Sequence, residues 1–304
     1  MRRLIVLTAL VATGALGIGL AAFQAPAQPK VLEVEKLKDN LFLLTGGGGN
    51  TAAFVTATGV VVVDSKLPGW GQVLLDTIKT VTDKPVTMVI NTHTHYDHVS
   101  GQVEFPATVE VVAHANTKAL MEQANPVYGL QTGPQPNIFK DHGGRGYPTR
   151  TFTDTLTLGQ GADRIDLYYF GRAHTGGDAY VVFPALHVMH AGDTFPGKDL
   201  PIMDINNGGS GVDFAGTLTK AAALPGIELV INGHNPKTTT IPELKEYAAF
   251  IGDFVAAAQA AKRAGKTVEE FVPTWTTPAK YAGYATPNPA RVKADAEVVY
   301  RETK

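Results

Sequence analysis

Four side chains that can bind a metal ion lie within six consecutive residues, at His93, His95, Asp97 and His98. They follow an apolar run at residues 86–90, which is typical of a buried strand. Alternate side chains of an extended segment share a face, so one tight bend here could supply ligands to two adjacent metal ions. Imidazole and carboxylate groups suit zinc, with iron or manganese as alternatives. The chain has no cysteine, which excludes a thiolate site.

Three further metal-binding side chains stand at or just past the ends of later predicted strands. These are His174, Asp193 and His234. Functional sites of α/β folds usually lie at the carboxyl ends of strands. The positions therefore suit a site at one sheet edge.

The elements that must position these residues alternate between strands and helices. A buried strand at 60–64, a helix at 71–83 and the strand at 86–90 form a β-α-β unit that delivers the first ligands at a strand end. A glycine-rich turn at 46–50 joins two earlier strands, and its backbone is expected to approach the site. Residues 124–149 are predicted as a long loop, of the kind that often forms a lid. Other strands are predicted at 31–37, 41–45, 51–56, 109–113, 151–158, 165–170, 179–183, 186–190 and 228–231, and helices at 116–123 with Asn116 as N-cap, up to about 223, at 241–264 and from Pro289.

The first 27 residues have the composition of a secretory signal peptide. Arg2 and Arg3 precede an apolar stretch at residues 4–23, and Ala25-Pro26-Ala27 fits a small-x-small cleavage site. We expect cleavage after Ala27, which predicts a periplasmic or secreted protein without stable membrane insertion. An uncleaved membrane anchor is the alternative.

Length and charge restrict the remaining choices. Residues 28–304 are expected to form a single domain with a C-terminal helical extension at about 241–304. Without the two arginines of the signal peptide, 24 Lys and Arg stand against 28 Asp and Glu, a net charge near −4. This charge disfavours nucleic acid as a partner.

The seven predicted ligands resemble those of the metallo-β-lactamase superfamily over about residues 31–236. The resemblance implies an α/β (α+β) fold, the four-layer αβ/βα sandwich, with the metal ions at one edge. It implies that His93, His95 and His174 hold a first zinc ion, that Asp97, His98 and His234 hold a second, and that Asp193 bridges them. Aspartate at this last position fits the cysteine-ligand β-lactamases poorly and resembles glyoxalase II and the lactonases more closely. His95, where the flavodiiron branch has glutamate, argues against that branch.

Two divalent ions that share a water lower its pKa toward neutrality and so supply hydroxide as a nucleophile. Asp97 is the candidate catalytic residue, because it can orient that hydroxide or pass a proton to the leaving group. The leading hypothesis is an exported zinc hydrolase that attacks an amide or ester carbonyl of a small molecule, with β-lactams as the first substrate to test. The alternatives are a lactonase or glyoxalase II-like thioesterase, a mononuclear iron dioxygenase of the same fold, and a non-catalytic metal-binding protein.

Other polar residues receive simpler interpretations. His114, His187 and His190 are expected to be structural, although one could support a ligand, and His142 lies in a loop that either faces solvent or meets a substrate. Asp64 could orient a ligand imidazole or cap a turn. The candidates for the substrate pocket are Phe195, Lys198 and Asn207.

Overall fold

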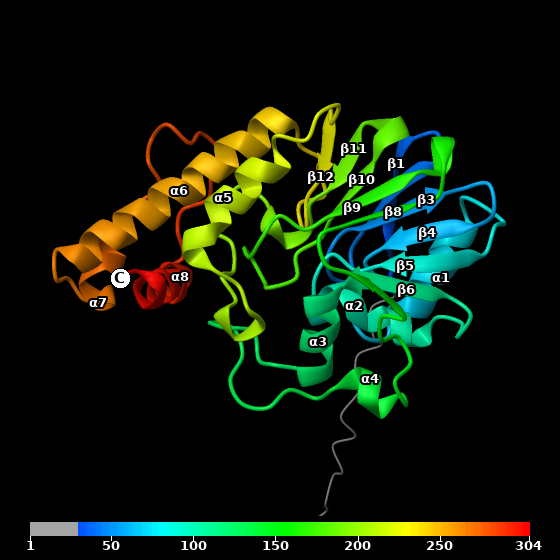
Figure 1. The fold of residues 1–304 in the computed structure, drawn as a ribbon, viewed down its shortest axis with the longest axis horizontal. Helices are drawn as coiled ribbons and strands as arrows, with labels where there is room; N and C mark the ends of the chain where they lie inside the picture. The colour runs from blue at the N-terminus through cyan, green and yellow to red at the C-terminus, as the bar shows by residue number, and fades with distance from the viewer. Residues whose placement is uncertain (1–29) are drawn as a thin grey trace, which may run out of the picture.

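Two β-sheets packed face to face form the body of the protein, and helices cover their outer faces (Figure 1). The computed structural model describes residues 30–304, so the predicted signal peptide lies outside the described residues. Within residues 30–304, no helix is both long and apolar enough to cross a membrane.

The first sheet has seven strands in chain order and changes from antiparallel to parallel at β4. Its first four strands form antiparallel hairpins, and β5, β6 and β7 then add in parallel. The strands are β1 (Glu33–Lys38), β2 (Leu41–Thr45), β3 (Thr51–Val55), β4 (Val60–Val63), β5 (Val86–Ile90), β6 (Glu110–His114) and β7 (Arg150–Phe152).

The second sheet has five strands in the order β12-β11-β10-β9-β8. Neighbours pair antiparallel except β11 and β12, which are parallel. The strands are β8 (Thr155–Leu158), β9 (Ile165–Tyr168), β10 (Tyr180–Phe183), β11 (Val188–His190) and β12 (Leu229–Ile231).

Strand β4 shows how its sequence specifies a buried position. Val60 and Val62 pack toward α1 (Gly71–Lys79), whereas Val61 and Val63 pack against the second sheet. In the second sheet, Val181 faces inward, and the alternate residues of β10 pack against α5 (Gly211–Ala221) and α6 (Ile241–Arg263). A strand covered on both faces is apolar throughout, as β4 and β10 both are. The three apolar layers confirm the predicted four-layer αβ/βα sandwich.

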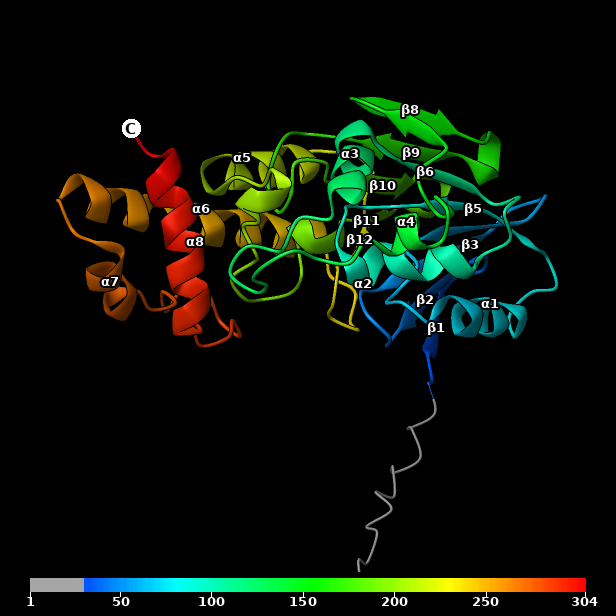
Figure 2. The same ribbon diagram turned by 90° about the horizontal axis from the view of Figure 1, so that it is seen from below.

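The helices after β12 extend from one end of the sandwich, as Figures 1 and 2 show. They are α6, α7 (Val268–Phe271) and α8 (Pro289–Glu302). The Glu302 carboxylate at the end of α8 accepts hydrogen bonds from the backbone N–H groups of Gly211 and Val212, which start α5. Helix α8 begins at Pro289, as predicted, and the structure shows Asn288 as its N-cap.

Three predictions about local structure need correction. The strand expected at 151–158 is two strands, β7 and β8, which belong to different sheets. The cap of α3 (Ala115–Gln123) is His114, whose Nδ1 accepts from the backbone N–H of Asn116. The loop at 124–149 contains a short helix, α4 (Ile138–Asp141). Only the first difference comes from pairing with distant strands. The other two arise from local caps that the pattern did not indicate, at His114 and at Asn137, whose side chain accepts from the Lys140 N–H.

Candidate metal centre

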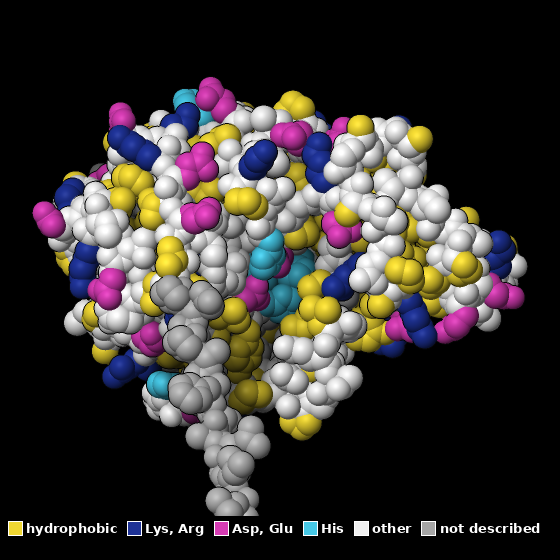
Figure 3. Space-filling view, turned by 180° about the vertical axis from the view of Figure 1, so that it is seen from behind, with side chains coloured by type: hydrophobic (Ala, Val, Ile, Leu, Met, Phe, Trp, Pro, Cys, Tyr) yellow, Lys and Arg dark blue, Asp and Glu magenta, His cyan; other side chains and the backbone are white. Residues whose placement is uncertain are grey.

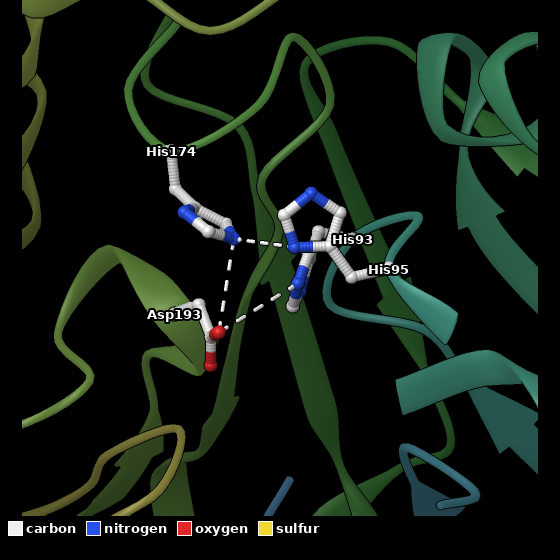
Figure 4. A group of neighbouring side chains, drawn as sticks. All are labelled: His93, His95, His174 and Asp193. Atoms are coloured by element: carbon white, nitrogen blue, oxygen red, sulfur yellow. Dashed lines mark hydrogen bonds and ion pairs between the residues drawn. The ribbon is translucent and has the colours of Figure 1, made fainter. Parts of the chain in front are cut away.

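One group of ligand atoms comes from three separate segments of the chain (Figure 4). His93 and His95 follow β5, His174 follows β9, and Asp193 follows β11. Nδ1 of His95 lies 2.9 Å from Nε2 of His174. Oδ2 of Asp193 lies 3.7 Å from Nε2 of His174 and 4.0 Å from Nε2 of His93. All four side chains are buried, and their ligand atoms lie close enough together to hold one metal ion.

A second group lies on the other side of the Asp193 carboxylate. Asp97 and His98 belong to the single turn α2 (Tyr96–Val99), and His234 follows β12. Nε2 of His98 lies 3.2 Å from Oδ1 of Asp193. Nε2 of His234 lies 3.1 Å from Oδ2 of Asp193 and 3.3 Å from Oδ2 of Asp97. The fold therefore brings all seven predicted ligands together, with Asp193 between the two groups.

The donor atoms fit a metal centre. Nε2 of His93 and Oδ1 of Asp193 are buried and form no hydrogen bond within residues 30–304. Buried polar atoms without partners are uncommon, and an ion coordinated here would satisfy them. Burial, with a further contribution from His95, lowers the pKa of His174 to about 3. This imidazole is therefore neutral at physiological pH, which is the form that binds metal.

Each of four imidazoles has a partner on the ring nitrogen that points away from the centre. Nδ1 of His98 lies 2.7 Å from Asp64, and Nε2 of His95 lies 2.8 Å from Asp204. The Ile202 carbonyl oxygen lies 2.7 Å from Nδ1 of His174, and the Thr92 hydroxyl lies 2.9 Å from Nδ1 of His93. Such contacts fix the orientation of a ring and hold its other nitrogen toward the metal.

The role of Asp64, left open by the sequence, is that of an orienting residue. Its Oδ2 accepts from the Thr92 hydroxyl and contacts His98, while Oδ1 accepts from the Thr92 backbone N–H at 2.8 Å. Asp204 contacts the ligand His95 in the same way, and the sequence did not indicate it. It lies in an irregular segment 109 residues after His95 and belongs to no recognisable motif.

The glycine-rich turn approaches the site, as predicted. The Gly49 N–H donates to the Asp97 carbonyl oxygen at 3.0 Å, and a Cβ atom on Gly49 would lie 2.1 Å from Cε1 of His98. Beneath the turn, the buried Lys66 ammonium donates to the carbonyl oxygens of Gly49 and Leu44. Burial lowers the pKa of Lys66 to about 7. The close approach explains why this position requires glycine.

One of the three proposed pocket residues, Asn207, lines a hollow beside the ligand His95. Phe195 is fully buried and stacks on Tyr247, so its assignment to the pocket is wrong. Lys198 pairs with Glu243 and Glu246 on α6. Asn207 is also buried, and its amide donates to Asp204 at 2.6 Å.

The other histidines are not part of the metal centre. His114 caps α3, and the buried His190 accepts from the Gly192 N–H. His187 is exposed, and its Nδ1 lies 2.7 Å from the Gly226 carbonyl oxygen. His142 is exposed and lines a hollow that includes no metal ligand.

A cavity of about 290 Å³ opens beside the ligands. Figure 3 shows the corresponding hollow, with histidine and acidic side chains at its floor. His174, Asp193 and His234 line one side, and the loop at 199–202 together with the start of α8 lines another. The C-terminal helices therefore contribute to the walls of the site.

The combination of an αβ/βα sandwich and this ligand set defines a metal-dependent hydrolase. Residues 44–234 match the metallo-β-lactamase superfamily, and the chain belongs to this family of hydrolases, which act on small molecules. A metallo-β-lactamase type 2 from Elizabethkingia meningoseptica is 29% identical over 195 residues, which are 58% of this chain and 68% of the relative.

Solved structures show the same fold. A metallo-β-lactamase from Pontibacter korlensis superposes with a TM-score of 0.58 at 19% identity, over 73% of this chain and 99% of that chain. The sec-alkylsulfatase Pisa1 from Pseudomonas sp. superposes with a TM-score of 0.68 at 14% identity, over 89% of this chain and 50% of that chain.

Proposed function

We propose that the protein is an exported dinuclear zinc hydrolase that directs water to the carbonyl carbon of an amide or ester and breaks its C–N or C–O bond. The observation that carries this proposal is the position of Asp193, whose carboxylate faces His93 and His174 on one side and His98 and His234 on the other. One aspartate shared by two ligand groups suits two adjacent ions. Iron and manganese remain alternatives for the same donor atoms.

Some residues of the site would position the metal ligands, and Asp97 would take part in the reaction. Two bound zinc ions would supply Lewis acidity and an activated water. Asp97 is the more accessible carboxylate, since 29% of its side chain is exposed against 6% for Asp193. We assign Asp97 the role of orienting the attacking water or carrying a proton to the leaving group. Asp64 and Asp204 would hold their imidazoles in place during the reaction.

β-Lactams are the first substrates to test, because the Elizabethkingia relative is a metallo-β-lactamase. The aspartate at position 193 also keeps lactones and thioesters in the panel. A periplasmic location rests on the predicted signal peptide. Amino-terminal sequencing of protein recovered from the periplasm would test it, with a mature chain beginning at Gln28 as the expected result.

The deciding experiment combines metal analysis with initial rates. Purified mature protein is assayed on a β-lactam, an acyl-homoserine lactone, lactoylglutathione and an alkyl sulfate, before and after chelation. We expect about two zinc ions per chain and turnover that disappears with the chelator and returns with zinc. Asp193→Asn should lower both metal content and turnover, whereas the matched Asp213→Asn, an exposed aspartate on α5, should lower neither.

Other outcomes would support the alternatives. About one iron per chain with oxygen consumption would indicate the dioxygenase. A zinc-loaded protein that turns over none of the four substrates would indicate a binding protein.

A further inference from the structure

The start of α8 places an arginine in the cavity beside the metal ligands. Arg291, Asn288 and Ala290 line the same cavity of about 290 Å³ as His174, Asp193 and His234. The matched family region ends at residue 234, so this wall comes from the helical extension that follows it. The extension therefore contributes directly to whatever the cavity binds.

We propose that Arg291 binds an oxyanion of the substrate, either a carboxylate or a sulfate group, while the scissile bond lies over the metal ligands. This assignment rests on the proposed hydrolase function and specifies the substrate class of the same site. It predicts that the natural substrate is a small molecule with a negative charge a few bonds from the bond that is cleaved.

The Arg291 guanidinium has no hydrogen-bond or ion-pair partner in the described part of the chain. Nη1 of Arg291 is buried and forms no hydrogen bond, and no carboxylate in residues 30–304 lies within ion-pair distance of the side chain. On the surface, by contrast, Arg172 pairs with Asp213 at 2.8 Å. A guanidinium that lines a cavity and has no acceptor from the protein can take one from a ligand bound there.

Two acidic residues lie near Arg291, Asp295 on the same helix and Asp199 in the cavity wall. Asp295, one helical turn later, is 1% exposed and accepts from the Met203 backbone N–H through Oδ1. Burial raises the pKa of Asp295 to about 8, while the nearby Arg291 charge acts in the opposite direction. Asp295 is therefore mostly protonated at neutral pH and compensates little of the arginine charge. Asp199 lines the cavity but makes no ion pair with Arg291 in the described part of the chain.

The shape and charge of an arginine side chain suit a carboxylate or sulfate group of a ligand. A planar guanidinium presents parallel N–H groups that match carboxylate and sulfate oxygens, and it stays charged at any working pH. The first turn of α8 adds a favourable dipole toward an anion at the same wall. The apolar side chains of Leu130 and Leu200 complete the lining. A substrate with an apolar body and one anionic group would complement this surface.

Binding of three probes with one tail tests the proposal on zinc-loaded protein. Hexanoate, hexyl sulfate and hexanol are titrated by calorimetry into wild type, Arg291→Met and Lys293→Met. Methionine keeps the apolar stem of arginine and removes the charge. Lys293 is the matched control, because it is an exposed cation on the same helix, pairs with Glu269 and does not line the cavity.

We expect Arg291→Met to lower the affinity for hexanoate, for hexyl sulfate or for both by roughly tenfold to a hundredfold. Its affinity for hexanol should equal that of wild type. The anion with the larger loss identifies the substrate group as carboxylate or sulfate. Lys293→Met should bind all three probes as wild type does. Arg291→Lys, which keeps charge but loses the two-pronged geometry, should fall between wild type and methionine.

Equal anion affinity in wild type and Arg291→Met would overturn the assignment. So would an equal loss in Lys293→Met, since the effect would then be one of overall charge. Because these titrations need no turnover, a protein that hydrolyses none of the test substrates can still confirm anion binding at Arg291. If the protein is an active hydrolase and Arg291→Met binds the anions as wild type does, the role of Arg291 is wrong but the proposed hydrolase function stands.

Discussion

Nε2 of His95 lies 2.8 Å from Oδ2 of Asp204, a residue 109 positions later in the chain. Asp204 also accepts from the Tyr128 backbone N–H at 3.0 Å and from the Asn207 amide at 2.6 Å. The side chain is fully buried and its charge is shared among these donors. One carboxylate thus ties the loop after α3 and the segment before α5 to a ligand imidazole.

Replacement of Asp204 by asparagine should lower the zinc affinity of the ligand group that contains His95. The amide keeps the shape but loses the charge that orients the His95 ring, and loss of such an orienting contact typically lowers metal affinity by about tenfold to a hundredfold. Competition with a chromophoric zinc chelator measures the affinity. The control is Asp213→Asn, and affinity equal to that of the control would show that Asp204 is not needed to hold the ring.

Replacement of Asp64 by asparagine should weaken the second group instead. Asp64 has a φ of 63°, and asparagine tolerates this left-handed conformation, so the backbone is preserved. An amide oxygen in place of Oδ2 can still accept from the Thr92 hydroxyl and His98, but the NH2 group in place of Oδ1 then faces the Thr92 backbone N–H, which is also a donor. The side chain must therefore give up or distort at least one of these contacts. We expect one zinc ion to be retained and the other to bind about tenfold or more weakly. Equal weakening of both ions in a stepwise titration would contradict the separate role.

Replacement of Gly49 by alanine should displace His98, because the new methyl group would lie 2.1 Å from the ring. We expect a loss of about 1–3 kcal/mol in the free energy of unfolding and a lower affinity for one zinc ion. Gly216 is the matched control, since a Cβ there meets nothing within 4 Å in the interior of α5. Gly216→Ala should be neutral or stabilising by up to about 1 kcal/mol. Thermal unfolding with and without zinc separates the two effects.

Replacement of Asp295 by asparagine should change how stability depends on pH. Burial raises the pKa of Asp295 to about 8 from an ordinary value of 3.8. The unfolded chain releases this proton near pH 4 and the folded chain holds it until about pH 8, so wild type loses stability across that interval. Asparagine does not titrate.

The stability of Asp295→Asn relative to wild type should therefore increase between pH 5 and pH 8, by at most about 1.4 kcal/mol per pH unit. Urea unfolding at pH 5, 6.5 and 8 measures the difference, with Asp213→Asn as the surface control. A difference between variant and wild type that stays constant over this range would mean that Asp295 is already ionised in the folded protein.

Local pattern was sufficient for the elements that depend on local contacts. The four valines of β4 were predictable, because a strand buried on both faces must be apolar at every position. The strand before His93 was predictable from its β-branched and apolar residues, although only its last two residues are fully buried. The start of α8 was predictable for a similar reason, since Asn288 and Pro289 form a cap that needs no distant partner. The spacing of His93, His95 and Asp97 likewise indicated a metal site from neighbouring residues alone.

Contacts between distant segments were decided only by the tertiary structure. The break between β7 and β8 depends on which sheet each half joins, and adjacent residues at 150–158 carry no signal of that choice. The contact of Asp204 with His95 and the place of Arg291 in the cavity wall depend on how α8 and the loops pack. The sequence by itself determined which side chains can bind metal. The packing of distant elements determined how those side chains are oriented and what faces them, because orientation and burial are properties of the assembled chain.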